Sequence, residues 1–175
     1  MLESLSKHIA GAIKKADPDG PASIEVMTYA LSLKLNFYFT LFFIVILGLF
    51  TGKILESLLS LLVVMISRKL TGGRHFSSLT HCMMFTATLC IIAPLIKLTP
   101  ELMILMNLIC LAIFLVYGPN HTLTEISSEK RLDYKIAICL CVLLNLILPS
   151  PFITIILLIQ SLSILSGGEH AWRRS

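Results

Sequence analysis

Residues 68–82 gather the side chains of this chain that could do chemistry. The segment combines basic residues, a glycine pair, two histidines and a cysteine, whereas the chain on either side is mostly apolar. A cysteine attacks as its thiolate, which a histidine base, nearby positive charge or a helix N-terminus favours. We therefore interpret Cys82 as a nucleophile and His75 as its base, with Ser78 or Thr80 capping the helix that carries Cys82 in its first turn.

The spacing of this pair sets a geometric condition. His75 and Cys82 lie seven positions apart. One straight helix would separate them by about 10.5 Å along its axis, whereas proton transfer needs roughly 2.6–3.2 Å between heavy atoms. The pairs Gly72-Gly73 and Ser77-Ser78 could bend the backbone. We therefore expect His75 on a loop that folds over the start of the helix carrying Cys82.

Each of these residues also has a non-catalytic interpretation. A lone cysteine at the edge of an apolar segment is commonly inert, and a histidine in a basic loop is commonly only solvated. The basic residues could set the topology and attract anionic lipid, and the glycine pair could only end a helix. His75, His81 and Cys82 could bind zinc, but no fourth ligand has suitable spacing. We therefore predict no metal and no cofactor.

The composition indicates a membrane protein. Of 175 residues, 56% are hydrophobic and 14% are charged, and the mean hydropathy is +0.89. Soluble domains carry charge on about a quarter of their residues. We therefore predict one all-α, polytopic membrane domain, residues 1–175, without a cleavable signal peptide. Four cysteines lie within apolar runs and are interpreted as small hydrophobic residues: Cys90, Cys110, Cys139 and Cys141.

The N-terminus, residues 1–21, is predicted to lie in the membrane interface. Leu2, Leu5, Ile9 and Ile13 would share one face of a helix over 2–16, with the lysines off that face. Such a helix could anchor the protein or dock a substrate. The sequence Asp17-Pro18-Asp19-Gly20-Pro21 then ends it.

About six apolar segments follow. They are residues 29–50, 54–67, 76 or 83 to 96, 102–117, 136–148 and 152–165. The last two flank Pro149-Ser150-Pro151 and are short, so they could form a hairpin that fails to cross. With six spans and a cytoplasmic N-terminus, the outer side receives only Lys53 and Lys97 of the 14 lysines and arginines. This bias predicts cytoplasmic termini and a cytoplasmic catalytic stretch at 68–82.

One pattern of residues lies between two apolar segments and reads Arg68-x3-Gly72-Gly73-x-His75-x6-Cys82. This pattern and its setting resemble the accessory gene regulator B (AgrB) family. Members of that family are integral-membrane cysteine peptidases of Gram-positive quorum sensing. The resemblance covers nearly the whole chain. It implies that Arg68 positions substrate or steadies the site and that Gly72 and Gly73 shape the turn.

The resemblance also implies the reaction and the partners. Cys82, activated by His75, would cleave the C-terminal tail from a small AgrD-like propeptide and leave an acyl-enzyme thioester. A cysteine or serine of the substrate would then close a thiolactone or lactone. The implied partners are the propeptide, the lipid bilayer of the plasma membrane and a second copy of the chain, and we expect no nucleic acid.

The chain departs from the family in two respects. Residues 120–129 lack a dense basic run, and no third catalytic residue stands out. Asn107, Asn145 and Glu56 qualify by residue type alone, and Asn107 better suits a hydrogen bond between helices, so we predict a Cys–His dyad. The alternatives are a small transporter, which would hold ionisable groups deep in the bilayer, and a non-catalytic membrane scaffold.

Overall fold

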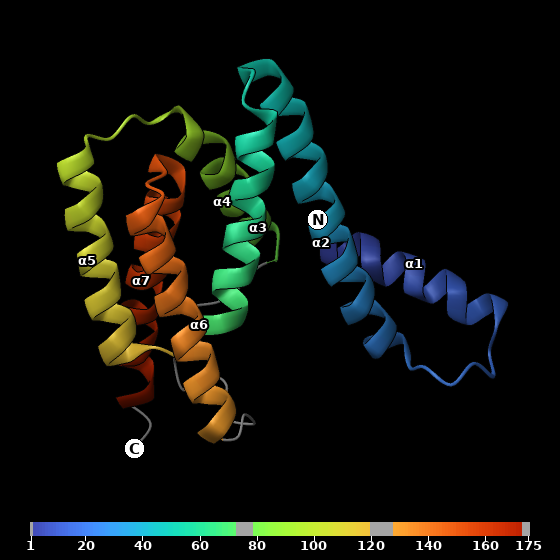
Figure 1. Ribbon diagram of the computed structural model, residues 1–175. Helices are drawn as coiled ribbons and strands as arrows, with labels where there is room; N and C mark the ends of the chain where they lie inside the picture. Colours follow the sequence, from blue (N-terminus) through green and yellow to red (C-terminus); the bar gives the residue numbers. More distant parts are fainter. Residues whose placement is uncertain (1, 73–78, 120–127, 173–175) are drawn as a thin grey trace.

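The computed structural model describes residues 2–72, 79–119 and 128–172. Within these ranges the chain forms seven α-helices, one short 3-10 helix and no strand (Figure 1). The all-α prediction is therefore confirmed. The elements are α1 Leu2–Ala16, α2 Ile24–Thr51, α3 Ile54–Thr71, α4 Leu79–Ile92, η1 Ala93–Leu95, α5 Pro100–Tyr117, α6 Ser128–Ile147 and α7 Pro151–Trp172.

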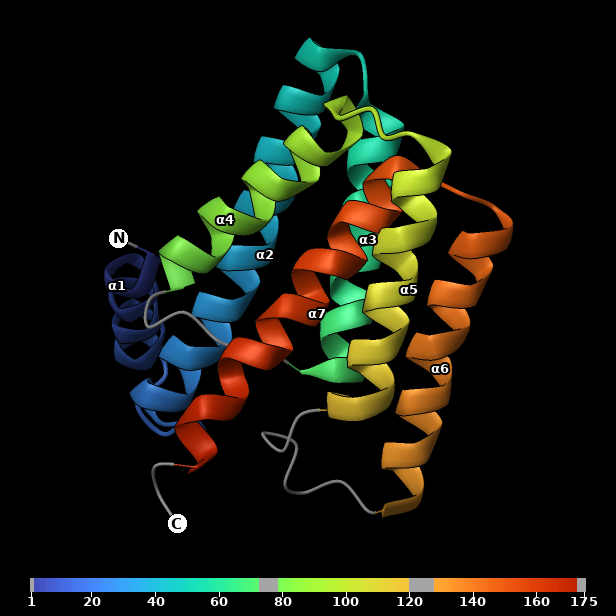
Figure 2. The ribbon, with the colours of Figure 1, turned by 90° about the vertical axis from the view of Figure 1, so that its left-hand side faces the viewer.

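Helix α3 joins two groups of helices. On one side α2 contacts α1, α3 and α4, and on the other α5 contacts α6 and α7. Helix α3 itself contacts α2, α4, α6 and α7. Figure 2 shows α3 between the pair formed by α2 and α4 and the bundle formed by α5, α6 and α7. The C-terminal end of α3, where the predicted catalytic stretch begins, contacts both groups through Arg68 with α4 and Thr71 with α7.

The chain connections separate into two ends of the molecule. In Figure 2 the α2–α3 turn, the link from η1 to α5 and the α6–α7 turn lie at the upper end. The C-terminal ends of α3 and α5 and the start of α6 lie at the lower end. Lys53 precedes α3 and Lys97 lies in the link before α5, whereas Arg68 and Lys69 occupy the last turn of α3. The basic residues thus follow the asymmetry on which the predicted orientation rests.

Helix α1 has the bounds that the sequence predicted, and its packing explains why part of its apolar face is exposed. It runs across α2 rather than along the other helices (Figure 1). Its fully buried residues are small, Ser6 and Ala10, whereas Leu5 and Ile13 are 43% and 46% exposed. Small residues permit the close approach to the neighbouring helix. Two residues of the predicted apolar face, Leu5 and Ile13, are therefore left exposed, whereas Ile9 is half-buried.

Six membrane spans are not confirmed. By length and composition, α2 and α5 are the two described helices that could cross a membrane. The apolar parts of α4 with η1 and of α7, Thr80–Leu95 and Pro151–Leu165, are shorter. Helix α3 has the length of α5 but carries Glu56, Arg68 and Lys69. An apolar run of 14 residues covers about 21 Å of a hydrocarbon core about 30 Å thick.

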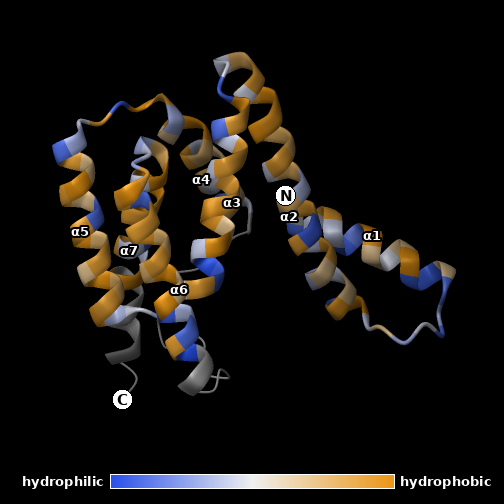
Figure 3. Ribbon diagram, in the orientation of Figure 1, coloured by the Kyte–Doolittle hydropathy of each residue, from blue (hydrophilic) through white to orange (hydrophobic). Residues whose placement is uncertain are grey.

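Three helices extend beyond the apolar segments that predicted them. Helix α3 ends at Thr71 rather than at residue 67, and α6 starts at Ser128 rather than at residue 136. Helix α7 continues to Trp172 rather than ending at residue 165. Hydropathy marks where a helix is apolar, as the colouring of Figure 3 shows, and it does not mark where a helix ends. Beyond the apolar runs of α3 and α6, the lysine, arginine and leucine residues are good helix formers.

A buried polar cluster joins α5, α6 and α7 near the α6–α7 turn. The Asn145 amide donates to Asn107 Oδ1 at 3.0 Å and to Thr154 Oγ1 at 2.8 Å. Asn107 also donates to Thr154 Oγ1 at 3.2 Å, and Asn145 Oδ1 accepts the Ser150 N–H at 3.1 Å. The prediction that Asn107 makes a hydrogen bond between helices is confirmed.

Candidate functional site

Cys82 lies where the sequence predicted, in the first turn of a helix. Helix α4 begins at Leu79, and the Cys82 side chain is half-buried. The N-terminus of a helix carries a partial positive charge, which favours an anion in its first turn. Thr80 lies inside α4 and is therefore not its cap, while Ser78 falls outside the described residues. His81, the neighbour of Cys82, is exposed.

Arg68 reaches Cys82 from the preceding helix. Its Nη1 donates a hydrogen bond to Cys82 Sγ at 3.1 Å, and both side chains are partly buried. The last turn of α3 and the first turn of α4 therefore meet through these two side chains. An anionic sulfur at this position would accept a charge-assisted hydrogen bond, which is stronger than a neutral one. The sequence pointed to Arg68, but it did not predict this contact.

Gly72 ends α3 with a backbone conformation that suits glycine. Its φ is 72°, in the left-handed region that side chains with a Cβ rarely adopt. Its N–H donates to the Arg68 carbonyl at 2.9 Å, so it caps the turn that carries Arg68. Gly72 therefore ends the helix, which was one of the two interpretations of the glycine pair.

Gln160 of α7 is the residue at this site that sequence analysis missed. Its Nε2 donates to Thr71 Oγ1 at 2.9 Å and to the Gly72 carbonyl at 2.7 Å. Gln160 is 5% exposed and Thr71 is fully buried. The available signal was an amide side chain inside the apolar run 152–165, since a polar group there needs a partner.

His75 and Gly73 lie outside the described residues, so the Cys–His pair stays a prediction. The three candidates for a third catalytic residue have other partners. Asn107 and Asn145 belong to the buried cluster at the opposite end of the bundle. Glu56 pairs with Lys53 at 2.8 Å, and it precedes Arg68 by about 18 Å along the axis of α3. None of the three lies beside Cys82.

The remaining cysteines fit their interpretation as small hydrophobic residues. Cys90 and Cys110 are fully buried, Cys139 and Cys141 are half-buried, and all are free thiols. Across the described ranges, no three His, Cys, Asp or Glu side chains group as a metal site would require. The zinc hypothesis included His75, so it is not tested by these residues.

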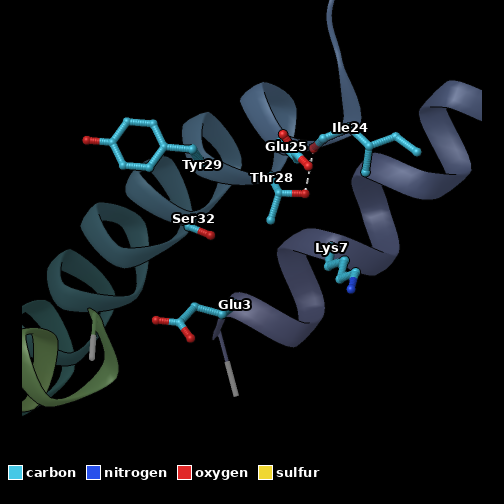
Figure 4. Close-up of a pocket in the computed structure, with 7 residues that line it drawn as sticks. All are labelled: Glu3, Lys7, Ile24, Glu25, Thr28, Tyr29 and Ser32. Carbon is cyan, nitrogen blue, oxygen red and sulfur yellow. Dashed lines mark hydrogen bonds between the residues drawn. The ribbon is translucent and has the colours of Figure 1, made fainter. Parts of the chain in front are cut away.

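A separate cavity of about 420 Å³ opens between α1 and α2. Figure 4 shows the residues that line it, with Glu3 and Lys7 on α1 and Thr28, Tyr29 and Ser32 on α2, and the Tyr29 ring points away from α1. The Thr28 hydroxyl already donates to the Ile24 carbonyl at 2.7 Å. The lining contains no cysteine or histidine. The candidate site is therefore the contact between Arg68 and Cys82 rather than this cavity.

Comparison with known proteins identifies the family of the chain. The profile described as accessory gene regulator B matches residues 6–167. The chain belongs to the AgrB family. An AgrB-like protein of Halalkalibacterium halodurans is 33% identical over 82 residues, which cover 47% of this chain and 42% of that relative. The chain thus matches less than half the length of this curated relative. No solved structure matches the chain.

Membership of the AgrB family connects the chain to accessory gene regulation in quorum sensing. Together with the two long apolar helices, it also indicates association with a membrane. Arg68, Gly72 and Cys82 all lie within the matched range, as do Thr71 and Gln160. The site described above is therefore part of the family domain.

Proposed function

We propose that this protein is a membrane cysteine endopeptidase that removes the C-terminal tail of an AgrD-like propeptide. The observation that carries the proposal is the 3.1 Å contact between Arg68 Nη1 and Cys82 Sγ in a chain of the AgrB family. The contact brings a fixed positive charge to a half-buried thiol in the first turn of a helix. These conditions favour an activated nucleophile.

In the first step, the Cys82 sulfur attacks the carbonyl carbon of the peptide bond that follows the pheromone segment. A C–S bond forms and the C–N bond breaks. His75 takes the thiol proton and returns it to the leaving amine, so the acidic tail departs as a free peptide. The product is a thioester between Cys82 and the remaining propeptide.

In the second step, a cysteine thiol or serine hydroxyl of the bound propeptide attacks that thioester. The new S–C or O–C bond closes a macrocycle, and Cys82 leaves as a thiol after it regains a proton. Exchange of one thioester for another is nearly balanced in free energy, so ring closure needs no ATP. Arg68 would hold the sulfur in orientation in both steps because its guanidinium is a fixed donor.

The proposed location is the cytoplasmic face of the plasma membrane. Helices α3, α4, α6 and α7 would lie in the bilayer beside α2 and α5, with both termini in the cytoplasm. Their short apolar runs could be accommodated by local thinning of the bilayer. The α1 face with Leu5 and Ile13 would rest in the interface. The propeptide, the bilayer and a second copy of the chain are the partners that the proposal implies.

The buried residues favour this proposal over a transporter. The polar side chains buried among the described residues are serine, threonine, asparagine and glutamine, and none is ionisable. Transporters commonly use ionisable groups within the membrane. A scaffold without catalytic activity would not require Cys82, so mutation can separate it from a peptidase.

The decisive experiment is co-expression with an epitope-tagged AgrD-like propeptide. Cys82→Ala and His75→Ala should each abolish removal of the tail, while the protein still accumulates in the membrane fraction. Cys139→Ala and His81→Ala are the matched controls, because they remove another half-buried thiol and an exposed imidazole. Tail removal at the wild-type rate in Cys82→Ala would refute the proposal.

A further inference from the structure

Helix α7 restrains the end of α3 through one buried side chain. The Gln160 Nε2 carries two hydrogens, and its two acceptors are Thr71 Oγ1 at 2.9 Å and the Gly72 carbonyl at 2.7 Å. Thr71 in turn donates to the Ser67 carbonyl at 2.8 Å. Gln160, Thr71 and Ser67 are all buried, being 5%, 0% and 1% exposed. Breaking these bonds would leave buried polar groups without partners, which is costly.

The restrained atoms belong to the turn that aims Arg68. The Gly72 N–H is bonded to the Arg68 carbonyl at 2.9 Å, and the Gly72 carbonyl is bonded to Gln160. Gly72 is thus held on both of its peptide groups, and each peptide group is planar. A positive φ at Gly72 gives little local preference for one geometry, since glycine is permissive. The contact from α7 supplies the restraint that the local sequence lacks.

The same turn carries the guanidinium that contacts Cys82. Arg68 lies one turn before Gly72 on α3, and its Nη1 reaches Cys82 Sγ at 3.1 Å. The position of an arginine guanidinium depends on the backbone to which the side chain is attached, so a shift of this turn would move the guanidinium away from the sulfur. Small displacements of a catalytic group can slow a reaction by roughly 100-fold.

We propose that Gln160 is a positioning residue for the Cys82 site: it fixes the last turn of α3 and thereby holds Arg68 against the sulfur. Gln160 does not touch the sulfur. It acts on a backbone carbonyl 88 positions away in the sequence. This role adds a positioning residue to the proposed peptidase. Only the test by propeptide processing rests on the proposed function.

The first test measures the reactivity of Cys82 without any substrate. The full-length protein in detergent is alkylated with iodoacetamide, and the rate at Cys82 is followed by peptide mapping, with Cys139 as an internal reference. Gln160→Leu should slow alkylation of Cys82 on the order of tenfold and leave Cys139 unchanged, because the displaced Arg68 no longer favours the reactive thiolate.

The matched control is Asn145→Leu. It removes another buried amide with several hydrogen bonds from the same bundle, at the opposite end from Cys82. Both leucine variants should lower the melting temperature by similar amounts. Only Gln160→Leu should slow the alkylation of Cys82. Equal slowing by the two variants would mean general loosening of the bundle and would overturn the assignment.

A double-mutant cycle with Arg68→Gln identifies the route of the effect. If Gln160 acts through Arg68, adding Gln160→Leu to Arg68→Gln should not slow the alkylation of Cys82 any further. Full additivity of the two effects on the alkylation free-energy barrier would overturn the assignment. Gln160→His keeps a ring N–H donor, so Cys82 in this variant should be alkylated faster than in Gln160→Leu. Equal alkylation rates in the two variants would argue against the hydrogen bond.

Propeptide processing separates this inference from the proposed function. In co-expression, Gln160→Leu should reduce tail removal roughly 10- to 100-fold. If wild-type protein cleaves no propeptide but the alkylation cycle shows coupling, the peptidase function fails and the role of Gln160 stands. If wild-type protein cleaves the propeptide and Cys82 in Gln160→Leu reacts like wild type, the role of Gln160 fails and the function stands.

Discussion

Arg68 Nη1 lies 3.1 Å from Cys82 Sγ although the two residues are 14 positions apart in the chain and belong to different helices. The contact unites the last turn of α3 with the first turn of α4. A helix C-terminus carries a partial negative charge and a helix N-terminus a partial positive one. Arg68 therefore adds to the positive potential at Cys82 that α4 alone would supply.

Substitution of Arg68 should lower the reactivity of Cys82. Arg68→Gln is expected to slow both iodoacetamide alkylation and tail removal by roughly 10- to 100-fold, which corresponds to the loss of one hydrogen bond to a charged group. Both rates in Arg68→Lys should lie between those of the wild type and of Arg68→Gln. The lysine ammonium keeps the positive charge but lacks the planar array of donors of the guanidinium.

Lys69→Gln is the control for this charge change. Lys69 is the next residue along α3 and is exposed, so its removal alters the net charge equally without touching the sulfur. It should leave both rates near those of the wild type. Equal losses in Lys69→Gln and Arg68→Gln would mean that the general basic potential matters and the specific contact does not.

Local signals predicted the breaks between helices. The helix predicted over 2–16 ends before the break predicted at residues 17–21, and the break around Pro149 also lies where predicted. Ser23 caps the second helix, where its hydroxyl accepts the Val26 N–H at 3.3 Å. These features depend on a few neighbouring residues, so a single sequence contains the information.

Contacts between distant residues could not be derived in the same way. The site pattern named Arg68, Gly72 and Cys82, but it gave no reason for the guanidinium to point at the sulfur rather than at substrate. Gln160 lies 88 positions from Gly72 and shares no local pattern with it. Its role depends on α7 packing against α3, which the hydropathy of either segment does not determine.

Gly72→Ala should impair both folding and processing. The backbone of Gly72, with φ 72° and ψ −136°, costs a residue with a Cβ about 1–3 kcal/mol, so the melting temperature should fall. Relaxation of that strain would also displace the turn that carries Arg68, and tail removal should slow by roughly tenfold or more.

Gly52→Ala separates these two effects. Gly52 has a φ of 67°, and a Cβ there would meet nothing within 4 Å. It follows the C-terminus of α2, at the opposite end of α3 from Cys82. This variant should lose similar stability and retain normal processing per folded molecule. A processing loss as large as that of Gly72→Ala would contradict a local role for Gly72.

The buried asparagine cluster should contribute to stability and not to catalysis. Asn145→Ala removes donors to Asn107 and Thr154 and the acceptor of the Ser150 N–H. The free energy of unfolding should fall by about 1–3 kcal/mol, as buried groups lose their partners. Unfolding by SDS, monitored by circular dichroism, measures the change, and alkylation of Cys82 should keep its rate in the folded protein.

Ser57→Ala provides the opposite case. The Ser57 side chain is fully buried, and its Oγ has no hydrogen-bond partner. Removing an unsatisfied hydroxyl should therefore leave stability unchanged or raise it by up to about 1 kcal/mol. A loss in Ser57→Ala as large as that in Asn145→Ala would show that volume, and not hydrogen bonding, determines both effects.

The proposed orientation predicts which end of α3 faces the cytoplasm. Lys53 precedes the first turn of α3 and Lys69 lies in its last turn, about 24 Å apart along the helix axis. In intact cells, a membrane-impermeant maleimide should label Lys53→Cys at once. It should label Lys69→Cys only after the membrane is permeabilised. Labelling of the parent protein gives the background from the native cysteines. Combining Lys69→Cys with Cys82→Ala removes the native cysteine that lies nearest to position 69. Labelling of both introduced cysteines from outside would mean that α3 does not span. Labelling of Lys69→Cys alone would reverse the orientation and expose the Cys82 site to the exterior, where it would not meet a cytoplasmic propeptide.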